Sequence, residues 1–173
     1  MQFQIDQALE VLTTTPGVLN AMLRGRSRAW LNCRKTPDAF SPADVVGHLS
    51  HGERTNWMPR AEAILKHQDS VAFDPFDRFA FRPLIENKSI EELLDEFASL
   101  REQSLVALNS LQLTDKQLAL PGKHPDLGDV TLSNLLATWV VHDLGHISQI
   151  VKAMANEYRE AVGPWFAYTT ILR

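Results

Sequence analysis

The chain has 173 residues, enough to bury one hydrophobic core, and we predict a single domain over residues 1–173. A content of 45% hydrophobic and 22% charged residues is that of a globular protein and excludes a disordered chain. The net charge of −4 and the scatter of both signs argue against nucleic acid as a partner. No apolar run approaches the roughly 20 residues that cross a bilayer, so we also expect no membrane partner. One cysteine and no secretion signal predict a cytoplasmic location.

The first half of the chain has the apolar spacing of helices. Residues 5–14 and 16–24 predict one helical arm that is interrupted at Pro16, because proline lacks an amide donor and clashes with the preceding turn. The Ser-Pro start of FSPADVV then predicts a helix over residues 41–67, bent at Pro59.

Residues 67–83, with the sequence HQDSVAFDPFDRFAFRP, form a long connection that holds four of the eight phenylalanines. A segment this aromatic is unfavourable in water, so we expect it to fold back over the helices. It would act there either as a functional lid or as a plug at one end of the core.

Helical patterns resume after this connection. Residues 88–111 begin with a capping box, residues 113–120 predict one or two turns, and residues 131–158 predict a helix about 40 Å long. No segment predicts a strand. We therefore expect an all-α fold, a four-helix bundle with one long crossing loop.

Two histidines lie four residues apart in the last predicted helix, within VVHDLGHISQ. A helical projection places His142 and His146 about 40° apart on the apolar side. His48 lies at the edge of the apolar face of another predicted helix. One inward histidine is typically a core residue with a hydrogen-bond partner, but several unpaired rings would each cost a few kcal/mol. Three imidazoles from two helices therefore predict a metal site with an open coordination position, the arrangement of catalytic zinc.

Several polar residues near these histidines are candidates for catalysis. Gln149 could orient a ligand or a substrate, although it could equally be a polar rim residue. Glu53 and His51 are candidate proton acceptors, with a salt bridge or solvent exposure as the simpler interpretation of each. The sequence HDLGH also differs by one residue from the HExxH motif, but the shorter acid Asp143 disfavours a metalloprotease.

The stretches FSPADVVGHLSHGE, HDLGHISQI and VGPWFAYTTILR, in this order, resemble the DinB-like superfamily over essentially the whole chain. The resemblance implies an up-down-down-up bundle with a divalent metal held by His48, His142 and His146. The expected metal is zinc or nickel, with iron or manganese as alternatives. The resemblance also implies a homodimer.

Characterised relatives imply a metal-dependent enzyme acting on a small molecule. A transferase that uses a low-molecular-weight thiol cosubstrate such as glutathione, mycothiol or bacillithiol is the first expectation, and a hydrolase is the second. The alternative is a non-catalytic bundle that a metal stabilises and that acts as a binding protein. The occupant of the fourth metal position separates the two: exchangeable water indicates catalysis, and a fourth protein ligand indicates structure.

Overall fold

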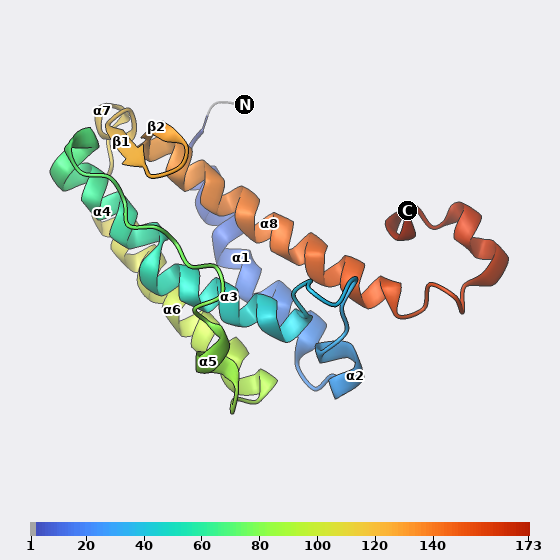
Figure 1. The fold of residues 1–173 in the computed structure, drawn as a ribbon. Coiled ribbons are helices and arrows are strands. Elements are labelled where there is room, and N and C mark those ends of the chain that lie inside the picture. Colours follow the sequence, from blue (N-terminus) through green and yellow to red (C-terminus); the bar gives the residue numbers. More distant parts are fainter. Residues whose placement is uncertain (1–2) are drawn as a thin grey trace.

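The computed structural model describes residues 3–173 and consists mainly of four long helical rods (Figure 1). The rods are α1 (Ile5–Leu23), α3 with α4 (Pro42–Thr55 and Trp57–His67), α6 (Ile90–Ser110) and α8 (Leu132–Asn156). The rods α1 and α8 run in one direction, and α3–α4 and α6 run in the other. The predicted four-helix bundle with its up-down-down-up order is thereby confirmed. The shorter elements are α2 (Arg28–Leu31), α5 (Arg82–Ile85), α7 (Asp115–Leu118) and 3₁₀ turns at Gln68–Ser70, Gly163–Tyr168 and Thr170–Leu172.

The rods α3, α6 and α8 begin where side chains satisfy their first backbone amides. At the start of α3 the Ser41 hydroxyl accepts a hydrogen bond from the Asp44 amide. The Asp44 carboxylate in turn accepts a hydrogen bond from the Ser41 amide. The same capping box opens α6 at Ser89 and α8 at Thr131. Each box removes two unpaired donors at a helix end, which fixes where the rod begins.

The predicted interruption at Pro16 is wrong, because α1 is one helix from Ile5 to Leu23. Proline has no amide to donate to the carbonyl four residues earlier, which is that of Leu12. The buried guanidinium of Arg101 donates to this carbonyl instead, over 2.8 Å. A contact from another rod thus satisfies the acceptor that Pro16 leaves free.

The predicted bend at Pro59 occurs three residues earlier. The helix stops at Thr55 and restarts at Trp57, with Asn56 between them at φ −116° and ψ −67°. The ring of Pro59 clashes with the carbonyl four residues before it, so the break must precede the proline. Pro59 then lies in the first turn of α4, where amides have no partner within the helix.

The expectation that the chain has no strand is also wrong. Strands β1 (Pro121–His124) and β2 (Gly128–Thr131) form an antiparallel hairpin just before α8. Lys123 and Asp129 form a cross-strand ion pair of 2.8 Å, and the Phe73 amide donates to the Lys123 carbonyl over 2.9 Å. Strands of four residues are too short to show an alternating pattern, and part of their stabilisation comes from a distant loop.

The long connection between α4 and α5 folds back along the bundle, as predicted (Figure 1). The side chains of Phe73 and Phe81 are buried at 6% and 0% exposure. Phe73 contacts the hairpin end, and Phe81 belongs to the apolar cluster at the other end. The connection therefore crosses the level of His48 on its way between the two ends.

Two apolar clusters fill the interior, and a layer of buried polar side chains lies between them. On α8, Asp143 lies between Trp139 of one cluster and Ile150 of the other. On α6, Arg101 lies in the same way between Phe97 and Leu108. We call this level the polar layer, and its members, one from each rod, are Thr15, Glu53, Arg101 and Asp143.

Arg101 connects the polar layer. Its guanidinium donates to Glu53 over 2.8 Å, to Asp143 over 2.6 Å and to the Leu12 carbonyl over 2.8 Å. The Trp139 indole donates to the same Glu53 oxygen over 3.2 Å. One cation on α6 thus bonds directly to each of the other three rods.

Burial and charge act in opposite directions within the layer. Burial raises the pKa of Glu53, and the neighbouring Arg101 charge offsets this only in part. Burial would also raise the pKa of Asp143, but the nearby His142 ring and the Arg101 charge lower it below its ordinary value. The Arg101 charge thus acts to lower the pKa of both buried carboxylates.

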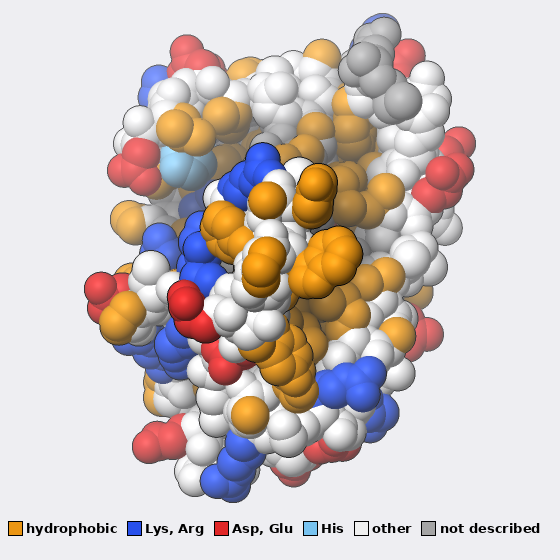
Figure 2. Space-filling view, turned by 90° about the vertical axis from the view of Figure 1, so that its right-hand side faces the viewer, with side chains coloured by type: hydrophobic (Ala, Val, Ile, Leu, Met, Phe, Trp, Pro, Cys, Tyr) orange, Lys and Arg blue, Asp and Glu red, His pale blue; other side chains and the backbone are white. Residues whose placement is uncertain are grey.

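The C-terminal segment after α8 extends beyond the end of the bundle, and its last turn folds back so that Leu172 is buried (Figure 1). Figure 2 looks onto this side and shows hydrophobic side chains gathered on it and on the surface behind it. The exposed aromatic and aliphatic residues of the segment are Tyr158, Trp165, Phe166, Tyr168 and Ile171. Within residues 3–173, no helix combines the length and the apolar character that a membrane crossing requires.

We predict that Arg101→Met lowers the free energy of unfolding by about 3–5 kcal/mol, because it leaves two buried carboxylates without their cation. Urea denaturation followed by circular dichroism measures this change. Arg24→Met is the matched control, since Arg24 pairs with Asp95 at the surface and its loss should cost less than about 1 kcal/mol. Equal losses in the two variants would contradict the central role of Arg101.

Candidate metal centre

Three histidines converge between α3 and α8. His48 comes from α3, and His142 and His146 come from successive turns of α8. The Nε2 atom of His142 lies 3.2 Å from that of His48 and 3.1 Å from that of His146. One ligand atom from each ring lies within 4.8 Å of the others. The structure therefore has the inward convergence that the helical projection predicts.

Hydrogen bonds at the outer nitrogens orient two of the rings. His48 Nδ1 lies 3.2 Å from the Arg78 carbonyl oxygen, and His146 Nδ1 lies 2.9 Å from Gln149 Oε1. Both oxygens are acceptors, so each Nδ1 atom carries the proton and donates it. The Nε2 atoms of His48 and His146 consequently direct lone pairs toward His142.

His142 is held mainly by packing. Its ring meets Trp57 edge-on at 5.0 Å between centroids, and Trp57 stacks on Trp139 at 5.6 Å. Its Nδ1 atom is buried without a hydrogen-bond partner among the described residues. The Asp143 carboxylate lies 4.0 Å from this nitrogen, too far for a hydrogen bond but close enough to act on it electrostatically. A small adjustment of either side chain would let His142 Nδ1–H donate to this carboxylate. Histidines that bind metals often donate their outer N–H to a carboxylate in this way.

The three rings fit a divalent cation. Burial and the neighbouring His142 lower the pKa of His48 to about 4 and that of His146 to about 3, so both rings are neutral at pH 7. The Nε2 atoms of His48 and His146 lie 3.2 and 3.1 Å from that of His142, and their lone pairs are available to a cation there. Tetrahedral zinc, with Zn–N bonds of about 2.0–2.1 Å, would space its nitrogens about 3.3–3.4 Å apart. The observed spacing is close to this value.

Phenylalanine rings form a wall on the His48 side of the cluster. Ring centroids of Phe40, Phe76 and Phe81 lie 5.3, 5.7 and 6.0 Å from that of His48. His51 stacks on the other side of this wall, against Phe76 at 5.0 Å, and is half-buried. His51 is not a member of the three-histidine cluster.

The other residues predicted from sequence have different surroundings. Gln149 contacts His146 directly, and its role in catalysis stays a prediction. The Oε1 atom of Glu53 accepts from Arg101 and Trp139, which places this carboxylate in the polar layer. Among the described residues the other oxygen of Glu53 has no partner, and its role as a proton acceptor also stays a prediction.

Two contributors to the centre were not predicted from the sequence. Arg101 lies on the apolar stripe of α6 together with Leu94, Phe97 and Leu108, and this position could have revealed a buried cation. Arg78 contributes a backbone carbonyl, for which no side-chain pattern gives a signal.

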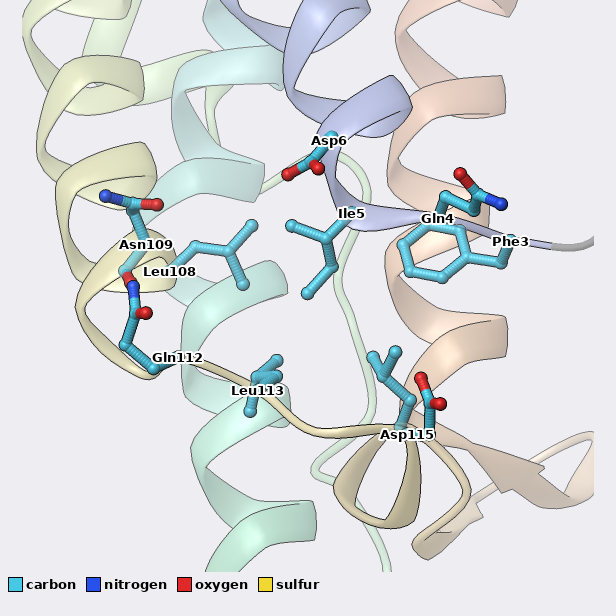
Figure 3. A pocket seen from close by; sticks show the side chains of 10 residues that line it. Phe3, Gln4, Ile5, Asp6, Leu108, Asn109, Gln112, Leu113 and Asp115 are labelled. Carbon is cyan, nitrogen blue, oxygen red and sulfur yellow. The ribbon is translucent and has the colours of Figure 1, made fainter.

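A separate cavity of about 520 Å³ lies at the opposite end of the bundle (Figure 3). It is bordered by the start of α1, the end of α6 and α7, with Asp6 and Asp115 at its rim and Leu108 and Leu113 inside. No histidine or cysteine lines it among residues 3–173. The metal-ligating chemistry of the described chain is thus gathered at the three histidines.

Comparisons with known proteins agree with this architecture. The structure of YfiT from Bacillus subtilis, described as "a probable metal-dependent hydrolase with an unusual four-helix bundle topology", superimposes with a TM-score of 0.72 at 24% identity, covering 91% of this chain and 87% of YfiT. The four-helix bundle protein TT2238 gives a TM-score of 0.58 at 22% identity, covering 83% of this chain and 95% of its own. No curated protein matches significantly in sequence.

These likenesses establish the fold, and the sequence establishes the family. The profile of the DinB superfamily matches residues 12–150, a span that contains all three histidines of the cluster and the whole polar layer. The chain belongs to the DinB superfamily.

Proposed function

We propose that His48, His142 and His146 bind one divalent metal ion and that the protein is a metal-dependent enzyme acting on a small molecule. The observation that carries this proposal is the convergence of three Nε2 atoms, of which those of His48 and His146 have free lone pairs because their Nδ1 atoms donate to other groups. Zinc or nickel suits three imidazoles best, with iron or manganese as alternatives.

The chain's own residues supply the surroundings for such chemistry. A divalent ion held by neutral imidazoles keeps its full charge and acts as a Lewis acid toward a water or thiol. The Arg78 carbonyl and Gln149 hold two of the ligand rings in position, and the phenylalanine wall packs against His48. His51, on the edge of that wall, is our candidate proton acceptor, because an imidazole can take a proton from a reacting group. Glu53 is a second candidate, through its unpartnered oxygen.

A thiol-dependent transferase is our first candidate reaction and a hydrolase our second. The family resemblance supports a low-molecular-weight thiol as cosubstrate, and the description of YfiT supports a hydrolase. If the metal instead only stabilises the bundle, the protein is a binding module. The buried free thiol of Cys33 agrees with a reducing compartment, and we propose the cytoplasm as the location.

We expect purified wild-type protein to hold one metal ion per chain, measured by elemental analysis and by competition with a chelator. His146→Ala should weaken zinc binding by more than about 100-fold, because even an outer hydrogen-bond partner of a ligand contributes about 10–100-fold. Gln149→Ala removes such a partner and should have the smaller effect. His67→Ala, at the exposed end of α4, is the control. Wild-type affinity in His146→Ala would rule out the ligand set.

We further predict activity that depends on metal in a screen of electrophilic and ester substrates with glutathione, mycothiol or bacillithiol. Turnover that requires both metal and thiol identifies a transferase, and turnover without thiol identifies a hydrolase. His48→Ala should abolish either activity while retaining its helical circular dichroism. A metal-loaded protein that is inactive throughout the screen would favour the binding module.

We propose a homodimer, with the exposed aromatic side chains of the C-terminal segment as the surface that a second copy covers. Trp165 and Tyr168 are 72% and 82% exposed, which is unusual for large side chains of a monomer. Sedimentation should give twice the chain mass for the wild type and a monomer for Trp165→Ser/Tyr168→Ser. Val106→Ser, an exposed residue on α6, is the control. A wild-type protein that sediments as a monomer would refute the proposal.

A further inference from the structure

A small hollow adjoins the histidine cluster on the far side of Gln149. It has a volume of about 270 Å³ and lies between α8 and the segment that leads into α3. Phe40 and Gln149 line it, and both also contact the cluster: Phe40 lies 5.3 Å from His48 between ring centroids, and Gln149 bonds to His146. The volume is near the lower end for small-molecule sites, which suits one functional group of a substrate.

The charged lining of this hollow is entirely basic. Lys35 and Lys152 border it, and no acidic residue does. Neither lysine is part of an ion pair within the described residues 3–173. By contrast, the cavity of Figure 3 contains two carboxylates and no cation. A basic hollow beside a cation site, in a chain whose net charge is −4, attracts anions locally.

Gln149 adds a neutral donor to the two ammonium groups. Its Oε1 atom accepts from His146 Nδ1, over 2.9 Å. The amide –NH₂ of the same side chain remains as a donor, and Gln149 also lines the hollow. One residue thus connects the orientation of a metal ligand with the recognition of a group in the hollow.

Gly145 keeps the hollow open. It lies in the middle of α8, where glycine weakens a helix relative to alanine. A Cβ atom at this position would meet no atom within 4 Å, so packing does not require glycine here. Its φ is not positive either, so the backbone does not require it. The missing side chain leaves free space next to His146, on the border of the basic hollow.

We infer that this hollow is an anion subsite of the metal centre, where Lys35, Lys152 and Gln149 bind the carboxylate or phosphate group of a small substrate. The inference rests on the proposed function and deepens it, because it gives the substrate class as a small organic anion. With its anionic group held in the hollow, the rest of the molecule extends past Gln149 toward the histidines.

The test is an NMR titration of metal-free and zinc-loaded protein with two probes, glutarate for a carboxylate and inorganic phosphate for a phosphate. Saturable amide shifts at Gly145 and Lys152 are expected in both forms of the protein. Lys35→Gln/Lys152→Gln should weaken probe binding by about tenfold, the change that two exposed ion pairs together supply, without altering zinc affinity. Gly145→Leu fills the hollow and should abolish binding.

Lys66→Gln/Lys116→Gln is the matched control, because it changes the net charge equally through exposed lysines that do not line the hollow. Shifts confined to the histidines and unaltered by Lys35→Gln/Lys152→Gln would overturn the subsite, as would the absence of saturable binding. The preference between glutarate and phosphate identifies the anionic group. Probe binding in a protein that takes up neither zinc nor nickel, iron or manganese would refute the proposed function and leave the subsite standing. Metal-dependent turnover without probe binding would support the proposed function and refute the subsite.

Discussion

The buried guanidinium of Arg101 is the constraint on which the rest of the bundle depends. A fully buried cation is unfavourable unless every one of its donors finds an acceptor, and here the acceptors come from three other rods. Sliding α3 or α8 by one turn would separate Glu53 or Asp143 from Arg101. The polar layer therefore fixes the register of the rods more strictly than the apolar clusters above and below it, because apolar contacts tolerate small displacements.

That register places the histidines. His48 lies little more than one turn before Glu53 on α3, and His142 is the neighbour of Asp143 on α8, so the ion pairs to Arg101 also fix the distance between these two rings. Gly47 brings the third component into place. A Cβ atom there would lie 2.5 Å from Ile85 Cγ2, so only glycine lets α5 approach α3 this closely. The close approach brings the end of the aromatic connection, and with it the Arg78 carbonyl, onto His48.

Local periodicity was sufficient to predict the rods and the three inward histidines, because both depend on which residues share a helix face. Two wrong predictions, the interruption at Pro16 and the absence of strands, concern contacts between distant segments. The effect of Pro16 is offset by Arg101 on another rod, and the hairpin depends on the Phe73 amide from a loop about 50 residues earlier. The positions of Glu53 and Arg101 on buried faces were readable from the helical spacing. Their pairing was not, since it requires the relative register of two rods.

The polar layer also sets the electrostatic surroundings of a cation at the histidines. Asp143 keeps a lowered pKa and lies on the His142 side of Arg101, whereas burial raises the pKa of Glu53. Asp143, whose carboxylate lies 4.0 Å from His142 Nδ1, is thus the anion of the layer beside the histidine cluster. This anion would stabilise a divalent ion bound by the three imidazoles, and its ion pair with Arg101 holds it in the polar layer. Because Asp143, the neighbour of His142, is bonded to Arg101, the donor cluster among residues 3–173 consists of three histidine nitrogens, and the metal ion that we propose there would keep one side open for a substrate.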